Sequence, residues 1–418
     1  MHIFWIIFIF TFGACIGSFL NVVIYRMPRG ESIVFPASHC TRCGKAIKGY
    51  DNIPLISWLI LRGKCRFCKT SISPRYFIIE LATALMVVGL YVCYYILKLR
   101  DGAGQFEQSW PMFAAHAMLL CVLLACSLVD IEHWMVPLEI CWFVSAVGII
   151  SATARPHEWV NVSQAGPSAT TGAMVIAAGV GLVLSAIAVR KGLILPSFID
   201  DDGKDFAEKV TSSKATPAKK KSDDKSRRKK RRNKSKPKRK EKKVRVAALA
   251  GKDKVNPRIE VLREVVYLAP AVVLAVLAGI LVTQISAFGQ WWQGLHDHGA
   301  GRLVSFEAAL LGYLVGGLFI WGIRIVGTLG FNKEAMGLGD IHILAAVGAV
   351  AGWAVVSVTF FLAPFIALIW AFYLLFRSNQ RELPYGPWLA VATVIVLLMY
   401  DPVMRLLEPQ IAVLRTIF

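Results

Sequence analysis

Long uninterrupted runs of apolar residues constrain this chain more than any other feature. Of its 418 residues, 56% are hydrophobic and only 18% are charged, and the mean hydropathy is +0.55. A run of about 20 apolar residues can cross a bilayer as a helix that satisfies its own backbone. The sequence therefore predicts an all-α polytopic membrane protein with about ten transmembrane helices, near residues 3–25, 77–98, 112–130, 137–153, 170–190, 264–286, 305–328, 341–353, 355–376 and 386–402.

Lysine and arginine predict how these helices are oriented. Segment 26–76 contains ten of them, so the positive-inside rule places it in the cytoplasm. Counting spans onward puts the basic segments 191–263 and 377–385 on the same side. The first run begins at Met1 without a basic n-region or a small-residue cleavage site, so we expect a retained helix and not a removed signal peptide. The connections with few positive charges are expected outside, namely 99–111, 154–169 and 287–304.

Much of the net charge of +20 is concentrated in residues 219–245, which hold 18 Lys or Arg and three acidic residues. Such a segment cannot bury itself and is expected to be disordered. It lies between two predicted spans on the cytoplasmic side, so anionic lipid headgroups are its expected partners. Nucleic acid is the less favoured partner, because no aromatic residues are interleaved to stack on bases.

Four cysteines in the first cytoplasmic segment form two Cys-x2-Cys pairs separated by 21 residues. This spacing predicts one structural zinc ion held by four thiolates, which would order a loop too short for its own hydrophobic core. Two disulfides are the competing interpretation, and a reducing cytoplasm disfavours them. A redox role for one pair would leave the other unexplained. The predicted zinc ligands are Cys40, Cys43, Cys65 and Cys68.

Two carboxylates lie where apolar runs meet water. Asp130 follows the apolar run that ends at Val129, and Asp340 closes Gly337-Leu338-Gly339-Asp340 directly before an apolar run. An acidic residue beside hydrocarbon is costly, so each is a candidate functional residue, with helix capping as the alternative. The predicted topology brings both to the cytoplasmic face. A pair of carboxylates at one depth suits acid and base hydrolysis, in which one activates water and the other protonates the leaving group.

Segments in a fixed order along the chain resemble those of type 4 prepilin peptidases. They cover most of the chain except about 155–304, and they are Gly17–Arg26 (GSFLNVVIYR), the four cysteines, Pro74-Arg75-Tyr76, Asp130 with Pro137, Glu334–Asp340 (EAMGLGD) and Pro384–Ala390 (PYGPWLA). Members of this family are membrane-embedded GxGD-type aspartic endopeptidases of the inner membrane. They remove the basic leader of type IV pilin-like precursors, both prepilins and pseudopilins.

The resemblance implies that Asp130 and Asp340 are the catalytic pair and that the active site faces the cytoplasm. Gly337 and Gly339 are expected to let the backbone approach the peptide without a side chain in the way. Many family members also methylate the new amino terminus with S-adenosylmethionine. This sequence has no glycine-rich nucleotide-binding fingerprint after a strand, so methylation here rests on the resemblance alone.

The chain also departs from the family pattern. Pro137 is followed by Leu138 where relatives have Asp, and His342 stands where Lys is frequent. Two extra spans flank the basic segment, whereas relatives have eight spans, and the aspartates lie 210 residues apart. The expected divisions are a first helix (1–25), the zinc loop (26–76), helices carrying Asp130 (77–153), an inserted helix pair with a disordered loop at 191–263 (154–304), and helices carrying the GxGD motif (305–418).

Two other classes of function remain open at this stage. A transporter could also use paired acidic residues and glycine breaks, but it would predict internal repeats, and neither the GxGD segment nor the cysteine pairs recur. A catalytically silent scaffold for secretion or pilus assembly would tolerate loss of either aspartate. The intact pair favours the peptidase.

Overall fold

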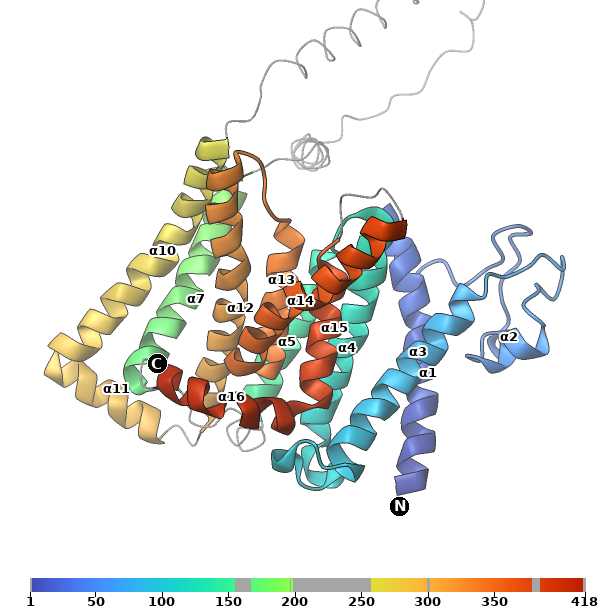
Figure 1. Cartoon of the computed structure of the whole chain (residues 1–418), viewed down its shortest axis with the longest axis horizontal. Coiled ribbons are helices and arrows are strands. Elements are labelled where there is room, and N and C mark those ends of the chain that lie inside the picture. Colours follow the sequence, from blue (N-terminus) through green and yellow to red (C-terminus); the bar gives the residue numbers. More distant parts are fainter. Residues whose placement is uncertain are drawn as a thin grey trace, which may run out of the picture. The chain divides into compact units, whose positions relative to one another are not determined.

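The computed structural model describes residues 2–154, 167–195, 197, 257–298, 301–377 and 384–415. These residues are almost entirely helical (Figure 1), and within them the only β-structure is a pair of isolated bridges, His39 with Ala46 and Lys64 with Ser71. The predicted all-α class is confirmed. Most of the basic segment 191–263 lies outside the described residues, so its expected disorder and lipid contacts remain predictions.

Each of the ten predicted apolar runs forms a helix. They are α1 (His2–Arg26), α3 (Arg75–Tyr91), α4 (Phe106–His133), α5 (Leu138–Ala154), α7 (Ala169–Arg190), α10 (Pro257–Gln284), α12 (Arg302–Phe331), α13 (Leu338–Ala351), α14 (Trp353–Arg377) and α15 (Gly386–Leu398). The other helices are short or amphipathic: η1 (Met27–Arg29), η2 (Gly49–Asp51), α2 (Ile56–Ile60), the π-helical turn η3 (Val92–Ile96), η4 (Asp101–Ala103), α11 (Ser286–His298) and α16 (Tyr400–Arg415).

Not all of these helices are long enough to cross a bilayer alone. Seven of the described helices have the length and composition of a membrane span, or eight if the bent pair α15 and α16 counts as one. Helices α5, α13 and α15 have 17, 14 and 13 residues. At 1.5 Å per residue they extend roughly 20–26 Å, less than the hydrocarbon thickness of about 30 Å. The chain is therefore a multi-pass membrane protein with several helix ends inside the bundle.

Contacts divide the chain into two compact units. The first comprises Met1–Gly181, Ala271–Arg324 and Met336–Phe418, and the second Leu182–Pro270 and Ile325–Ala335. In the second unit Ser197 donates a hydrogen bond of 3.1 Å to Glu264, and the Thr328 hydroxyl accepts one of 3.3 Å from the Ala335 N–H. Both aspartates and all four loop cysteines belong to the first unit.

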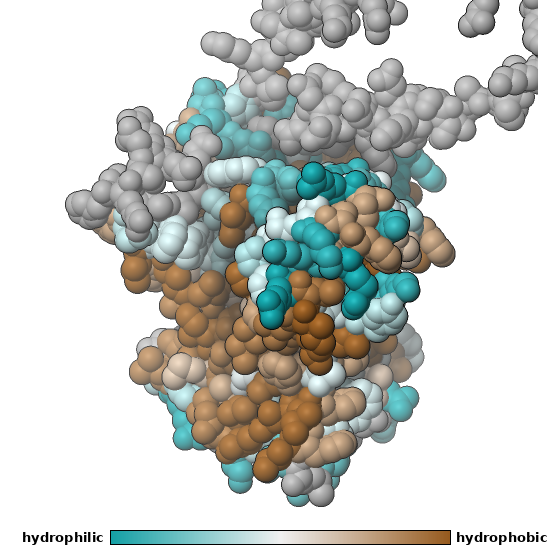
Figure 2. Space-filling view, turned by 90° about the vertical axis from the view of Figure 1, so that its right-hand side faces the viewer, coloured by the Kyte–Doolittle hydropathy of each residue, from teal (hydrophilic) through white to brown (hydrophobic). Residues whose placement is uncertain are grey.

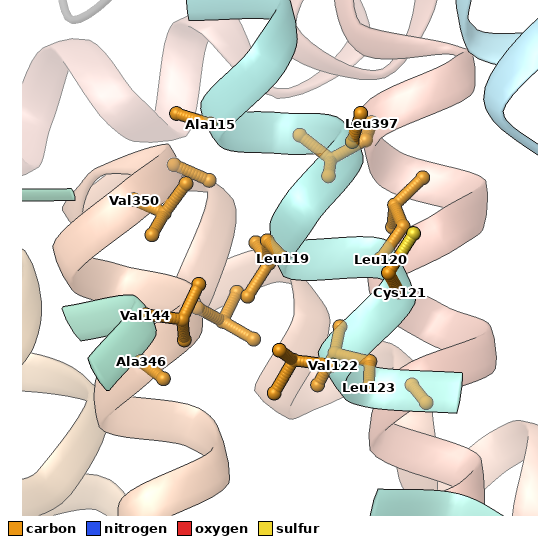
Figure 3. Close-up of a cluster of buried hydrophobic side chains, with 14 of the residues drawn as sticks. Ala115, Leu119, Leu120, Cys121, Val122, Leu123, Val144, Ala346, Val350 and Leu397 are labelled. Atoms are coloured by element: carbon orange, nitrogen blue, oxygen red, sulfur yellow. The ribbon is translucent and has the colours of Figure 1, made fainter. Parts of the chain in front are cut away.

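Helix α4 is the centre of the first unit. Two thirds of its apolar window (67%) is buried, against 28% for α1 and 22% for α14, which turn most of their surface outward to lipid. Leu119 and Leu123 of α4 pack with Val144 of α5, Val350 of α13 and Leu397 of α15 in one cluster (Figure 3). Because α4 is enclosed on several sides, its last turn is held in a fixed place among α5, α13 and α15.

Helix α13 is held by close backbone contacts with its neighbours. A Cβ added at Gly312 or Gly316 of α12 would overlap the carbonyl groups of Gly348 and Leu344 in α13. On another side, a Cβ at Gly148 of α5 would lie 2.7 Å from Val350. Glycine at these positions lets helix backbones approach as they do in small-residue membrane interfaces. The helix that carries Asp340 therefore has little freedom to shift.

Gly348→Ala should destabilise the bundle, because the added methyl group would overlap the Gly312 backbone and overpacking costs about 1–3 kcal/mol. Gly322→Ala on α12 is the matched control, since its Cβ would meet no described heavy atom within 4 Å. The measurement is thermal unfolding of both variants in detergent. Equal melting temperatures for the two variants would contradict the close α12–α13 packing.

Candidate active site and cysteine cluster

The structure brings Asp130 and Asp340 together although 210 residues separate them in sequence. Asp130 lies in the last turn of α4 and Asp340 in the first turn of α13, and each is only 8% exposed. The beginning of α15 contacts both helices, since a Cβ added at Gly386 would meet Asp130 of α4 and the Ile343 side chain, one turn after Asp340 in α13. The intervening part of the chain has therefore not separated the two helix ends.

Each aspartate lies inside a terminal helical turn. The predicted span 112–130 ended at Asp130, and the predicted span 341–353 began one residue after Asp340. Helix α4 continues three residues past Asp130 and ends where Trp134 adopts a left-handed conformation (φ 54°) and donates a hydrogen bond of 2.9 Å to the Asp130 carbonyl. Helix α13 begins at Leu338, because Gly337 takes the extended conformation of an N-cap. An acidic side chain in a first turn interacts favourably with the helix dipole.

The beginning of α15 forms a third side of this site. A Cβ added at Gly386 would lie 2.9 Å from Asp130 Oδ2, so the backbone approaches the carboxylate directly. The sequence marked Pro384–Ala390 as family-like without giving it a role, and its role here is to place a helix N-terminus against Asp130.

The two glycines of the GxGD motif have different surroundings. A Cβ added at Gly339 would lie 2.6 Å from Cβ of Val136, in the segment after α4. A Cβ at Gly337 would lie 3.9 Å from Asp340 Oδ2, an ordinary contact distance. Close packing against Val136 therefore accounts for glycine at position 339. This contact joins the segment after α4 to the beginning of α13.

Arg324 of α12 is a supporting residue that the sequence analysis did not identify. Its side chain is fully buried, and Nη1 donates a hydrogen bond to the Met336 carbonyl, immediately before Gly337. The sequence could have indicated this residue, because Arg324 lies inside a predicted membrane span. Burying a charged side chain there costs free energy, so such a residue usually has a defined partner. The contact ties the GxGD loop to the neighbouring helix.

His342 and Glu132, each two residues from one of the aspartates, have partners of their own. The Trp142 indole N–H donates a hydrogen bond of 3.2 Å to His342 Nδ1, and the two rings meet edge to face at 5.8 Å. His342 is therefore a neutral imidazole that packs on α5. Glu132 forms an ion pair of 2.6 Å with Arg75 at the beginning of α3. Both residues connect elements around the site.

The four predicted metal ligands converge as expected. One side-chain sulfur from each of Cys40, Cys43, Cys65 and Cys68 lies within 4.8 Å of the other three, and Cys40 and Cys68 are 3.7 Å apart. Tetrahedral zinc with bonds of about 2.3 Å requires sulfur–sulfur distances of roughly 3.8 Å. The cluster is therefore shaped to hold one metal ion.

The two cysteine pairs have the same backbone construction. The N–H of Cys40 donates to the carbonyl of Lys45 (2.9 Å), and that of Cys65 donates to Thr70 (2.8 Å). Gly44 and Lys69, one residue after each pair, both have positive φ angles of 67° and 57°. Hydrogen bonds from the Thr70 hydroxyl and backbone N–H lower the pKa of the Cys68 thiol to about 6, which favours the thiolate that a metal requires.

Comparison with known proteins agrees with these features. Residues 11–94 match the bacterial peptidase A24 N-terminal domain, and residues 266–372 match the type IV leader peptidase family. A prepilin leader peptidase/N-methyltransferase from Stutzerimonas stutzeri is 24% identical over 94% of this chain and 89% of its own length. Two separate parts of the chain are thus similar to type IV leader peptidases. Its N-terminal match contains all four cysteines and its C-terminal match contains Asp340, while Asp130 lies between the two.

Relatives with higher identity are matched over shorter stretches. The prepilin leader peptidase/N-methyltransferase of Myxococcus xanthus is 42% identical over 133 residues, which is 32% of this chain and 36% of that protein. The Pseudomonas aeruginosa protein of the same name is 38% identical over 30% of this chain and 47% of its own length. The matches thus span about a third to a half of these two relatives. No solved structure matches the chain.

Replacing Cys40 and Cys65 together with Ser should remove the bound metal, because each pair then supplies a single thiolate. Metal analysis of purified protein is expected to give about one equivalent for the unaltered chain and none for this variant. The control replaces Cys15 and Cys93, which lie outside the cluster, and should keep full metal content. Full retention of metal in the first variant would refute a four-cysteine site.

Proposed function

We propose that this protein is an aspartic endopeptidase that removes the basic leader from type IV pilin-like precursors at the cytoplasmic face of the inner membrane. The observation that carries the proposal is the convergence of Asp130 and Asp340, two buried carboxylates from distant segments, beside the N-terminus of α15. The names of the relatives, prepilin leader peptidases, supply the substrate class.

The surroundings of the two carboxylates favour different roles. The beginning of α15 lies against the Asp130 carboxylate, where the positive end of the helix dipole stabilises negative charge. Two buried carboxylates close together cannot both ionise easily, so one of them keeps a proton, and we assign that proton to Asp340. Asp130 then deprotonates the attacking water, and Asp340 protonates the departing amine of the scissile peptide.

The location of the site suits a substrate that is basic at one end and apolar along its stem. Both aspartates lie in terminal turns of helices, at the end that the distribution of Lys and Arg predicts to be cytoplasmic. A basic leader can enter from water while the apolar stem of the precursor remains in lipid. Type IV pilin-like precursors, prepilins or pseudopilins, have this character.

We extend the proposal to a structural zinc ion held by the four cysteines. Their soft thiolate ligands and tetrahedral spacing fit zinc, which when bound would cross-link the loop between α1 and α3. Methylation of the new amino terminus with S-adenosylmethionine is proposed from the names of the relatives, and no residue is assigned to it. Zinc contributes to folding of the loop and takes no part in the proton transfers.

Asp130→Asn and Asp340→Asn should each abolish cleavage of a co-expressed pilin-like precursor. Asparagine keeps the shape and some hydrogen bonding of aspartate but cannot exchange a proton. The double variant should be no worse than either single one, because both residues act in one step. Mass spectrometry of the product amino terminus is the measurement, with metal content and membrane insertion expected to be unchanged. Near-normal cleavage by either single variant would remove the proposed pair.

Gly386→Ala tests the contact between α15 and Asp130. The added methyl group must displace the carboxylate, whose Oδ2 would otherwise lie 2.9 Å away. A misplacement of this size at a catalytic group can cost about 100-fold in rate. Gly89→Ala in α3 is the control, because its Cβ would contact no heavy atom of the described chain within 4 Å. We expect a large fall in cleavage rate for Gly386→Ala at normal thermal stability, and an unchanged rate for Gly386→Ala would contradict this role.

A further inference from the structure

Helix α2 in the cysteine loop exposes its apolar side instead of burying it. Ile56, Leu59 and Ile60 are 54%, 57% and 70% exposed, whereas the polar Ser57 is buried. The three aliphatic residues are spaced i, i+3 and i+4, so they form one face of the helix. A short surface helix in water would have the opposite arrangement.

The inner side of α2 is already filled. The Trp58 ring packs against Phe77 of α3 with centroids 5.2 Å apart. Gly63 lies directly beneath this indole, and a Cβ there would be 2.9 Å from the Trp58 ring. The aliphatic face cannot therefore turn inward without displacing Trp58.

Contacts with α3 place α2 beside a membrane span. The Leu55 N–H, at the beginning of α2, donates a hydrogen bond of 2.7 Å to Glu80 of α3. Glu80 is five residues beyond Arg75, the first residue of α3. At 1.5 Å per residue, this contact lies about 7–8 Å along the span. Interfacial helices bury their apolar face to a comparable depth, about 5–10 Å below the headgroups.

The loop that carries α2 is strongly basic. Segment 26–76 holds ten Lys or Arg and only two acidic residues, and one of these, Asp51, forms a bidentate pair with Arg66. Arg62 and Lys64 follow α2 directly and are exposed. Viewed from the side of α2, hydrophilic residues lie directly above a broad hydrophobic band (Figure 2). Basic residues next to an apolar face are the pattern of a helix bound to an anionic lipid surface.

We propose that α2 anchors the cysteine loop in the cytoplasmic leaflet, with Ile56, Leu59 and Ile60 inserted among the acyl chains and Arg62 and Lys64 on anionic headgroups. The neighbouring span α3 also exposes an aliphatic side chain near its beginning, Ile78, which is 58% exposed. A second copy of the chain or a basic leader peptide would bring like charges onto the same surface, which disfavours both as occupants. The anchor fixes the height of the cysteine cluster at the membrane and does not depend on the peptidase function.

The test uses the full-length protein in nanodiscs of phosphatidylglycerol and phosphatidylethanolamine. A photoreactive benzophenone amino acid at position 60 should form covalent lipid adducts on irradiation, detected by intact mass. The control places the same group at position 45, where the exposed lysine lies over the Phe67 ring near the cluster. We expect at least a tenfold excess of lipid adducts at position 60. Equal yields at both positions, or adducts only to another protein chain, would overturn the anchor.

A second variant tests the headgroup contacts. Arg62→Gln with Lys64→Gln, measured with the probe at position 60, should lower the adduct yield several-fold in phosphatidylglycerol and leave it unchanged in phosphatidylcholine. Metal content and melting temperature of each sample show that the loop has folded. An unchanged yield in phosphatidylglycerol would overturn the assignment of these two residues to anionic lipid.

Discussion

The burial of two carboxylates in an apolar bundle is the constraint on which the rest of this structure depends. Each is only 8% exposed, and burying a charge without compensation is costly. Helix N-termini supply positive partial charge at both positions, because the beginning of α15 lies against Asp130 and Asp340 lies in the first turn of α13.

Precise placement of these helix ends requires rigid neighbours. Glycines of α12 and α5 let α13 pack backbone to backbone, and Arg324 ties the carbonyl of Met336 to α12. The result is a loop whose position is set by three separate elements. Under the proposed function this rigidity would hold the reacting groups in place, since small displacements greatly reduce the rate. The glycines fix the packing around the two aspartates.

The sequence predicted the helices well because lipid leaves few alternatives. All ten apolar runs are helical, and the four cysteines converge. It did not predict α11 or α16, because their apolar residues are interleaved with polar ones and never form a run of spanning length. Nor did it identify Arg324 or the role of Gly386. Those contacts join residues that are far apart in sequence or involve backbone groups, and neither leaves a local pattern.

Helices α7 and α11 contact a different side of α12 from the side that packs on α13. Gly312 and Gly316 of α12 face α13, whereas Glu307 and Leu310 contact α7 at Gly172 and Gly179. The buried Glu307 carboxylate also lies 3.3 Å from His296 of α11. A 30-residue helix with two packing surfaces can thus accept additional helices laterally without disturbing the α4–α13 contact. The two aspartates can therefore lie together although 210 residues separate them in the chain.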